Sequence, residues 1–210
     1  LYSFTGTAEL ALGLMINLNL SLNHVIKSTS NGEWDRNKFM SYQLFDKTLG
    51  IVGFVRLGEI LCKYGRALGM KIISYDPKKI INNKNVRQVE LNYLLKNSDF
   101  ISIHASYLEN ENYHLIGKTE IDLVKKDVII INTARGELLD LEYLIQKLKD
   151  GKIRGIGIDT IENEYNFNRD ILKLQKNHNI VFTPHIGGCK YESTIATEKI
   201  VLETLFDNLK

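Results

Sequence analysis

The chain has little cysteine, and its two cysteines show no pattern of a bonded pair or a metal site. Cys62 and Cys189 stand far apart, with no C-x-x-C motif and no cluster of histidines nearby. This spacing argues against a disulfide framework and against a zinc site. We therefore predict no metal centre and a reducing, cytoplasmic environment.

An excess of one charge and a long apolar run are also missing. The 27 lysines and arginines nearly balance 25 aspartates and glutamates, which leaves a formal net charge of +2. Such a mild and scattered charge predicts no nucleic-acid or membrane partner. The apolar stretch 10–16 is too short to span a bilayer. No signal-peptide pattern is present, and because the sequence opens on Leu1 we expect that a longer reading frame has lost its start.

Residues 48–77 form the most informative stretch of the sequence. The apolar run 49–52 has no polar face, which is typical of a strand buried in a parallel sheet. Apolar residues then recur with a helical period over 57–68, and a second apolar run covers 71–75. Asp76 follows this second run directly. A strand, turn, helix and strand in this order predict a dinucleotide-binding unit, with an acid placed for the ribose hydroxyls.

A glycine motif lies in the turn of this unit. Gly53 and Gly58 match the first and last glycines of G-x-G-x-x-G, and Asp76 comes 18 residues after Gly58. The middle position holds Val55, a β-branched residue where glycine normally lets the backbone approach a pyrophosphate. The motif alone also fits an ordinary strand, turn and helix packed through glycines.

The rest of the sequence continues the alternation of strands and helices. We predict an α/β fold with a doubly wound parallel sheet of Rossmann type, helices on both faces and the strand order 3-2-1-4-5-6. Residues 1–28 are expected to form a helix that mediates dimerisation, 29–47 a connecting loop, and 48–210 the sheet domain with a closing helix from about residue 193 to 209. The polar run 78–87 reads as a surface loop. The six expected strands are 49–52, 71–75, 100–104, 128–132, 153–158 and 180–183.

Four polar residues follow predicted strands and should gather at one edge of the sheet, where ligands of such folds bind. They are Arg135, Asp159, Glu164 and His185. An arginine can bind a carboxylate through two parallel hydrogen bonds. A glutamate beside a histidine orients the imidazole ring and favours its protonated form, which suits acid-base catalysis. Each residue alone could be an ordinary surface side chain, but together they indicate hydride transfer on a 2-hydroxy acid.

The sequence resembles the NAD-binding domain of the D-isomer-specific 2-hydroxyacid dehydrogenases. The resemblance covers nearly the whole chain and is carried by the segments 7–9, 53–58, 75–77, 132–136 and 184–188. The segment 32–40, which runs into 47–50, points more narrowly to the phosphoglycerate dehydrogenase branch.

This resemblance implies a role for several residues. Arg135 would hold the substrate carboxylate, His185 would exchange the hydroxyl proton, and Glu164 would support His185. The cofactor would be NAD, the substrate 3-phosphoglycerate, and the assembly a homodimer built on the first helix. The implied cofactor-binding residues are Gly53, Val55, Arg56, Leu57, Gly58, Asp76, His104, Thr133, Ala134, Asp159, Gly187 and Gly188.

The sequence also departs from the family pattern. Val55 replaces a glycine, while Ser106 and Tyr165 each stand where the family has proline. The separate substrate domain of the family is almost wholly missing. These departures keep a second hypothesis open, in which the chain is a non-catalytic cofactor-sensing or dimerising module, or a truncated inactive relative.

Overall fold

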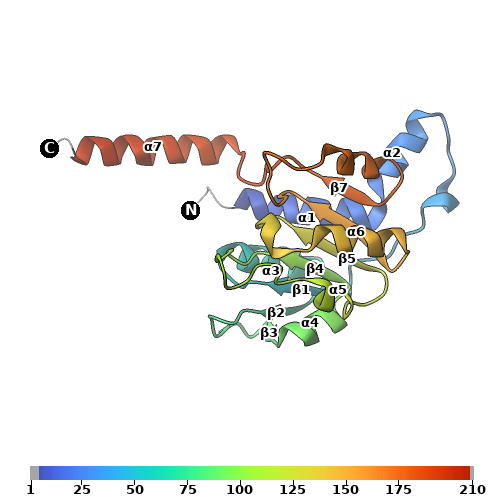
Figure 1. The fold of residues 1–210 in the computed structure, drawn as a ribbon, viewed down its shortest axis with the longest axis horizontal. Helices are drawn as coiled ribbons and strands as arrows, with labels where there is room; N and C mark the ends of the chain where they lie inside the picture. The colour runs from blue at the N-terminus through green and yellow to red at the C-terminus, as the bar shows by residue number, and fades with distance from the viewer. Residues whose placement is uncertain (1–4, 209–210) are drawn as a thin grey trace.

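A parallel sheet of seven strands organises the computed structural model, which describes residues 5–208 (Figure 1). The strands lie in the order β3-β2-β1-β4-β5-β6-β7, and each neighbouring pair is parallel. This arrangement confirms the predicted α/β class. The strands are β1 (Thr48–Val52), β2 (Lys71–Tyr75), β3 (Arg87–Gln88), β4 (Phe100–Ile103), β5 (Val128–Asn132), β6 (Ile153–Ile158) and β7 (Ile180–Phe182).

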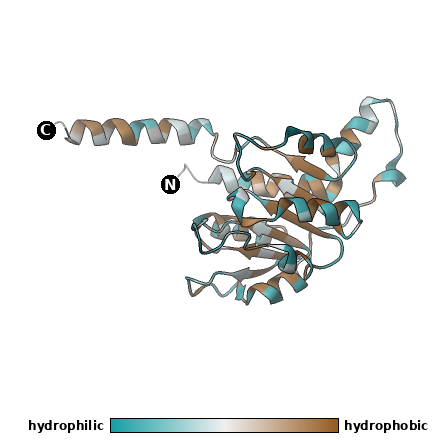
Figure 2. Cartoon of the chain, viewed as in Figure 1, coloured by the Kyte–Doolittle hydropathy of each residue, from teal (hydrophilic) through white to brown (hydrophobic). Residues whose placement is uncertain are grey.

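The central strands are apolar because both of their faces are covered. Every residue of β4 and of β5 is buried, as expected for a parallel sheet between two helical layers. Figure 2 shows these strands as hydrophobic, whereas hydrophilic residues predominate on the outer sides of the helices and in the loops. The unbroken apolar runs in the sequence are therefore explained by burial on both sides.

The two helical layers meet alternate residues of the strands. Helices α1 (Thr5–Leu20) and α3 (Arg56–Ala67) cover the face that includes Ile129 and Ile131. Helices α4 (Leu91–Asn97), α5 (Lys118–Ile121) and α6 (Leu141–Lys149) cover the face that includes Val128 and Ile130. Successive residues of a strand point to opposite faces, so a single strand contributes to both cores.

The sheet has one strand more than the six that the sequence predicts. Arg87 and Gln88 of β3 pair with Ile73 and Ser74 of β2, although the stretch 78–87 reads as a loop. Both β3 residues are exposed, so they carry no apolar signal. The predicted order 3-2-1-4-5-6 counts only the six predicted strands, so its strand 3 is the 100–104 strand. The prediction that this strand lies at the sheet edge is wrong. That strand is β4 beside β1, and β3 takes the outer place.

The N-terminal segment forms two helices rather than one. Helix α1 ends at Leu20, and α2 (Leu22–Ser30) begins after Ser21, whose φ of 51° breaks the helical path. The apolar face of α1 packs against β5, β6 and α3. The domain's own core therefore covers most of the apolar face from which the sequence predicts a dimer, and the dimer stays a prediction. The buried side chains of α1 include Ala8, Ala11, Leu14, Met15 and Leu18.

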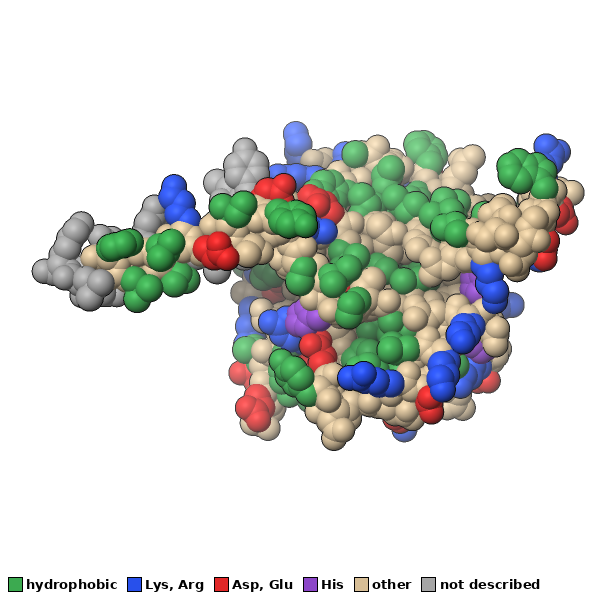
Figure 3. All heavy atoms as spheres, turned by 90° about the horizontal axis from the view of Figure 1, so that it is seen from above, with side chains coloured by type: hydrophobic (Ala, Val, Ile, Leu, Met, Phe, Trp, Pro, Cys, Tyr) green, Lys and Arg blue, Asp and Glu red, His purple; other side chains and the backbone are tan. Residues whose placement is uncertain are grey.

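Three 3-10 helices and a long last helix are the remaining elements of the described chain. A short 3-10 helix, η2 (Arg36–Phe39), lies in the predicted connecting loop, η3 (Gly136–Leu138) follows β5, and η4 (Arg169–Lys176) precedes β7. Helix α7 (Tyr191–Asn208) agrees with the expected closing helix, of which residue 209 lies outside the described part. It extends away from the sheet in Figure 1, and Figure 3 shows hydrophobic side chains along its surface. Within residues 5–208, no helix is long and apolar enough to cross a membrane.

Candidate active site

The turn between β1 and α3 is built on two closely packed glycines. Gly53 has a φ of 89°, in the left-handed region that favours glycine. A Cβ atom on Gly53 would lie 2.5 Å from the backbone nitrogen of Ala105, and one on Gly58 would lie 2.5 Å from the carbonyl oxygen of Gly53. Both positions therefore require glycine, one for the turn and one for helix-strand contact, as in dinucleotide-binding folds.

Val55 is the residue immediately before α3. Its φ of −85° and ψ of −173° are extended, so the backbone holds valine without strain. The valine side chain is 42% exposed and provides no hydrogen bond to the first turn of the helix. The Val55 side chain does not cap α3, and a helix N-terminus favours an anionic group. The turn therefore fits a pyrophosphate, with the Arg56 and Leu57 amides as the predicted donors.

Asp76 lies at the end of β2 and holds the glycine turn in place. Its carboxylate accepts hydrogen bonds from the backbone nitrogens of Phe54, at 2.9 Å, and Lys78, at 3.0 Å. Each carboxylate oxygen has a second acceptor site, so the predicted contact with ribose hydroxyls stays compatible with these bonds. Lys78 pairs with Glu111 and Lys79 with Glu59. Both lysines that follow Asp76 thus have acidic partners of their own.

His104 lies inside the domain, directly after β4. Its Nε2 atom is 2.9 Å from the Ser102 hydroxyl, and its Nδ1 atom is buried without a partner among residues 5–208. Burial lowers the pKa of His104 to about 4, so the ring is neutral at pH 7. The backbone of His104 and Ala105 packs against Gly53 of the glycine turn, and the contact of His104 with the cofactor stays a prediction.

Arg135 sits in a tight turn after β5 that Asn132 organises. The Asn132 side chain accepts a hydrogen bond from the Ala134 amide at 3.0 Å and donates one to the Arg135 carbonyl at 2.8 Å. Thr133, in the same turn, is buried. The Arg135 guanidinium is exposed and donates from one nitrogen to the Ala134 carbonyl at 2.7 Å. Its other N–H groups point to a role in binding a carboxylate.

Asp159 ends β6 and fixes the loop that follows β7. The Asp159 carboxylate is 2% exposed and accepts hydrogen bonds from the Thr183 hydroxyl and from the amides of Ile186 and Gly187, both at 2.9 Å. The His185 amide also donates to the Asp159 carbonyl at 2.9 Å. Asp159 therefore positions the His185 loop, a structural role that accompanies its predicted place beside the cofactor.

His185 and Glu164 form the predicted pair. The Nδ1 atom of His185 lies 2.9 Å from the Glu164 carboxylate. Both side chains are partly exposed, and His185 has a φ of 54°, in the left-handed region that is unusual for a residue other than glycine. Because Nδ1 faces Glu164, the Nε2 atom is the one left for a substrate. Strained backbone of this kind clusters at functional sites.

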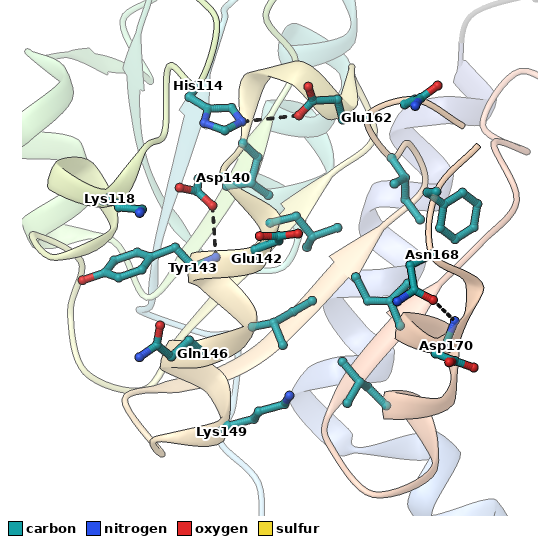
Figure 4. Close-up of a pocket in the computed structure, with 18 of the residues that line it drawn as sticks. His114, Lys118, Asp140, Glu142, Tyr143, Gln146, Lys149, Glu162, Asn168 and Asp170 are labelled. Carbon is teal, nitrogen blue, oxygen red and sulfur yellow. Dashed lines mark hydrogen bonds and ion pairs between the residues drawn. The ribbon is translucent and has the colours of Figure 1, made fainter. Parts of the chain in front are cut away.

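Two clefts open on this side of the domain. The smaller, of about 500 Å3, is lined by Asp159, Glu164 and His185 among other residues. The larger, of about 1000 Å3, lies between α6 and η4 and includes none of the three predicted catalytic residues (Figure 4). Among the described residues, no group of three or more histidine, cysteine, aspartate or glutamate side chains could hold a metal ion.

Asp159, Glu164 and His185 lie together in the structure, and the turn that carries Arg135 packs against the segment that leads to Glu164. A Cβ atom on Gly136 would lie only 2.0 Å from the backbone nitrogen of Glu162, so the Arg135 turn and the segment before Glu164 are in direct contact. Sequence reasoning assigned no role to Asn132, Gly136 or Glu162. The role of Asn132 could have been predicted from the sequence, because a polar residue at the end of a buried strand commonly forms hydrogen bonds with the turn that follows.

The family comparison agrees with this geometry. Residues 12–187 match the model of the D-isomer specific 2-hydroxyacid dehydrogenase NAD binding domain. The chain is 38% identical over 207 residues to a D-3-phosphoglycerate dehydrogenase of Methanocaldococcus jannaschii, covering 97% of this chain and 39% of the relative. It is 37% identical over 209 residues to a glyoxylate reductase of Thermococcus litoralis, covering 95% and 62%.

A solved structure shares the same fold. D-lactate dehydrogenase from Aquifex aeolicus, complexed with NAD and lactic acid, superposes with a TM-score of 0.87 at 30% identity, covering 99% of this chain and 68% of that one. The chain thus spans 39% and 62% of the length of the two curated relatives.

Proposed function

Because this chain belongs to the D-isomer-specific 2-hydroxyacid dehydrogenases, as their NAD-binding domain, we propose that its whole protein oxidises or reduces a small 2-hydroxy acid with NAD. The observation that carries this proposal is the His185–Glu164 pair, with Nδ1 and the carboxylate 2.9 Å apart. A histidine held by a carboxylate at the edge of a dinucleotide-binding sheet is equipped to move the proton that accompanies hydride transfer.

Each residue has a defined task in this proposal. NAD, when bound, accepts or supplies the hydride. Nε2 of His185 would take the proton from the hydroxyl oxygen while the hydride leaves the carbon that bears this hydroxyl, so that the C–O bond becomes a carbonyl. In the reverse direction His185 would return the proton to the carbonyl oxygen. Glu164 stabilises the resulting imidazolium and fixes its orientation. Arg135 binds the substrate carboxylate through paired hydrogen bonds.

Within this class we propose 3-phosphoglycerate as the substrate. Support comes from the segment 32–40 and from the similarity to a D-3-phosphoglycerate dehydrogenase, which would place the protein in serine biosynthesis. Similarity to a glyoxylate reductase is almost as high, so substrate choice needs a direct assay. NAD reduction should be compared with 3-phosphoglycerate, glycerate and glycolate, using the chain joined to a substrate domain. Preference for glycolate would assign the protein to the glyoxylate reductases instead.

We also propose a cytoplasmic homodimer. Two free cysteines support the reducing environment. The dimer is supported by apolar side chains on the arm 29–47, where Trp34 is 94% and Met40 87% exposed, since clustered exposed apolar groups mark interaction surfaces. Light scattering at micromolar concentration should give twice the monomer mass, and Trp34→Ser should reduce it. A monomeric parent would oppose the dimer.

NADH titration of the 210-residue chain separates enzyme from non-catalytic module. Binding of NADH, with turnover once a substrate domain is joined, supports the dehydrogenase. Binding without turnover would favour the cofactor-sensing module.

A further inference from the structure

The segment 161–167 carries Glu164, and Ile161 is its one side chain that packs against the described hydrophobic core. Most of its residues are exposed. Across residues 5–208, its side chains make polar contacts with other segments from only two residues, Glu162 and Glu164. Glu164 contacts His185 itself. Glu162 is therefore the one side chain that can fix this segment by a polar contact independent of the catalytic pair.

Glu162 is bound by an aromatic pair from the loop between β4 and α5. The Tyr113 hydroxyl donates to the Glu162 carboxylate, with oxygen distances of 3.1 and 3.3 Å, and the His114 Nε2 atom lies 3.5 Å from it. The two rings stack, with centroids 4.0 Å apart. Figure 4 shows the contact between His114 and Glu162 at the rim of the larger cleft. Desolvation and the bond to Glu162 raise the pKa of Tyr113, so its hydroxyl keeps the donated proton.

Backbone contacts make this aromatic pair a firm anchor. The His114 amide donates to the Glu137 carbonyl at 2.7 Å, and Ile116 bridges to Leu139. Gly136, next to Arg135, packs directly against the Glu162 backbone. Glu162 thus sits where the loops after β4, β5 and β6 meet. Because the Glu162 carboxylate is bound at this junction, the backbone of the next two residues, Asn163 and Glu164, is held in place as well.

The path from Glu162 to Glu164 is short and turned. Asn163, between them, has a φ of 54°, and the Asn166 amide closes the turn on the Asn163 carbonyl at 2.9 Å. A fixed Glu162 and a closed turn leave Glu164 little freedom apart from its own side-chain rotation. Release of Glu162 would let the exposed segment move, and misplacement by about 1 Å costs catalytic groups on the order of 100-fold in rate.

We propose that Glu162, held by Tyr113 and His114, is a positioning residue that keeps the Glu164 carboxylate on the Nδ1 side of His185. The role rests on the proposed function, since it serves the His185–Glu164 pair. It also connects the two halves of the site, because the Glu162 backbone packs against the turn that carries Arg135.

The test is the tautomer of His185, read by long-range proton–nitrogen NMR on the 210-residue chain at alkaline pH, where imidazole is neutral. A carboxylate at Nδ1 holds the proton on that nitrogen. Comparison with a His185→Gln spectrum assigns the signals. We expect the Nδ1–H form in the parent and a fall of about tenfold or more in its ratio to the Nε2–H form in Glu162→Ala, from loss of a charge-assisted hydrogen bond.

Two matched variants isolate the cause. Glu142→Ala removes another exposed acid that lines the same cleft and should leave the tautomer ratio unchanged. Glu162→Gln still accepts from Tyr113 and should restore much of the parent ratio. If Glu162→Ala does not fold, Tyr113→Phe removes only the hydroxyl and should lower the ratio in the same direction.

The outcomes are distinct. A parent spectrum with the Nδ1–H form that persists in folded Glu162→Ala or Tyr113→Phe overturns the positioning role and leaves the proposed function standing. A parent without the Nδ1–H form overturns the catalytic pair, and the positioning role with it.

Discussion

The Gly187 amide donates a hydrogen bond to the buried Asp159 carboxylate over 2.9 Å, and this contact ties the end of β6 to the loop that carries His185. Asp159→Asn replaces one acceptor oxygen with an NH2 group, which cannot accept from the Ile186 or Gly187 amide. We expect a loss of about 1–3 kcal/mol in the free energy of unfolding, measured by urea denaturation. An unchanged free energy would show that the loop holds its shape without Asp159.

Cofactor choice follows from Asp76. A carboxylate accepts from ribose hydroxyls but repels a 2′-phosphate, and Lys78 and Lys79 are already paired with glutamates. We expect NADH to bind at least about tenfold more tightly than NADPH, since opposed like charges are costly. Side-by-side calorimetric titration measures the ratio, and equal affinities would contradict this role for Asp76.

Val55→Gly should tighten NADH binding. The valine side chain stands at the N-terminus of α3, where a pyrophosphate would approach the Arg56 and Leu57 amides. Recovery of a single charge-assisted hydrogen bond is worth about 1.5–3 kcal/mol, which is about tenfold or more in affinity. The free energy of unfolding should change little, because glycine is a better cap residue than valine. Titration of both chains decides the point. Equal affinity would mean that valine does not obstruct the cofactor.

The pH dependence of stability should carry a contribution from His104. Its pKa is lowered to about 4 by burial, so between that value and the ordinary value near 6.5 the unfolded chain binds more protons than the folded one. The contribution of the neutral, buried His104 to the free energy of unfolding is fully present above pH 6.5, and it is lost as the pH falls toward 4. We expect a loss of about 2 kcal/mol between pH 7 and pH 5 from this group.

The matched variant for this measurement is His104→Gln, which does not titrate. Urea denaturation at the two pH values should show a smaller pH-dependent loss in the variant than in the parent. An identical loss in both would assign the effect to other groups.

The sequence predicted those parts of the fold whose signal is local. Burial on both faces produced the apolar runs of β1 and β5, from which both strands were predicted. Strand β3 escaped detection because its two exposed residues pair only through their backbone. The apolar side of α1 was real, but periodicity cannot say whether a helix packs on its own sheet or on a partner.

The candidate site divides in the same way. The residues that directly follow strands could be predicted as neighbours, because a parallel sheet brings the carboxyl ends of its strands to one edge. His185 and Glu164 could also be recognised as an acid-base pair from their side-chain chemistry. Gly136 and Glu162 were missed, since their importance comes from the approach of loops distant in sequence. Asp159 lies directly after β6, as the sequence indicates, yet its bonds to the His185 loop depend on a backbone path that no motif reveals.

The most direct test of the catalytic assignment is the turnover of His185→Ala in the chain joined to a substrate domain, with NADH affinity measured as the control. Loss of a general acid-base group should lower kcat by roughly 10²- to 10⁴-fold while NADH affinity stays within about twofold of the parent, because Nε2 serves the substrate and not the pyrophosphate or ribose. Turnover within tenfold of the parent would show that the proton takes another path, and would contradict the assignment of His185.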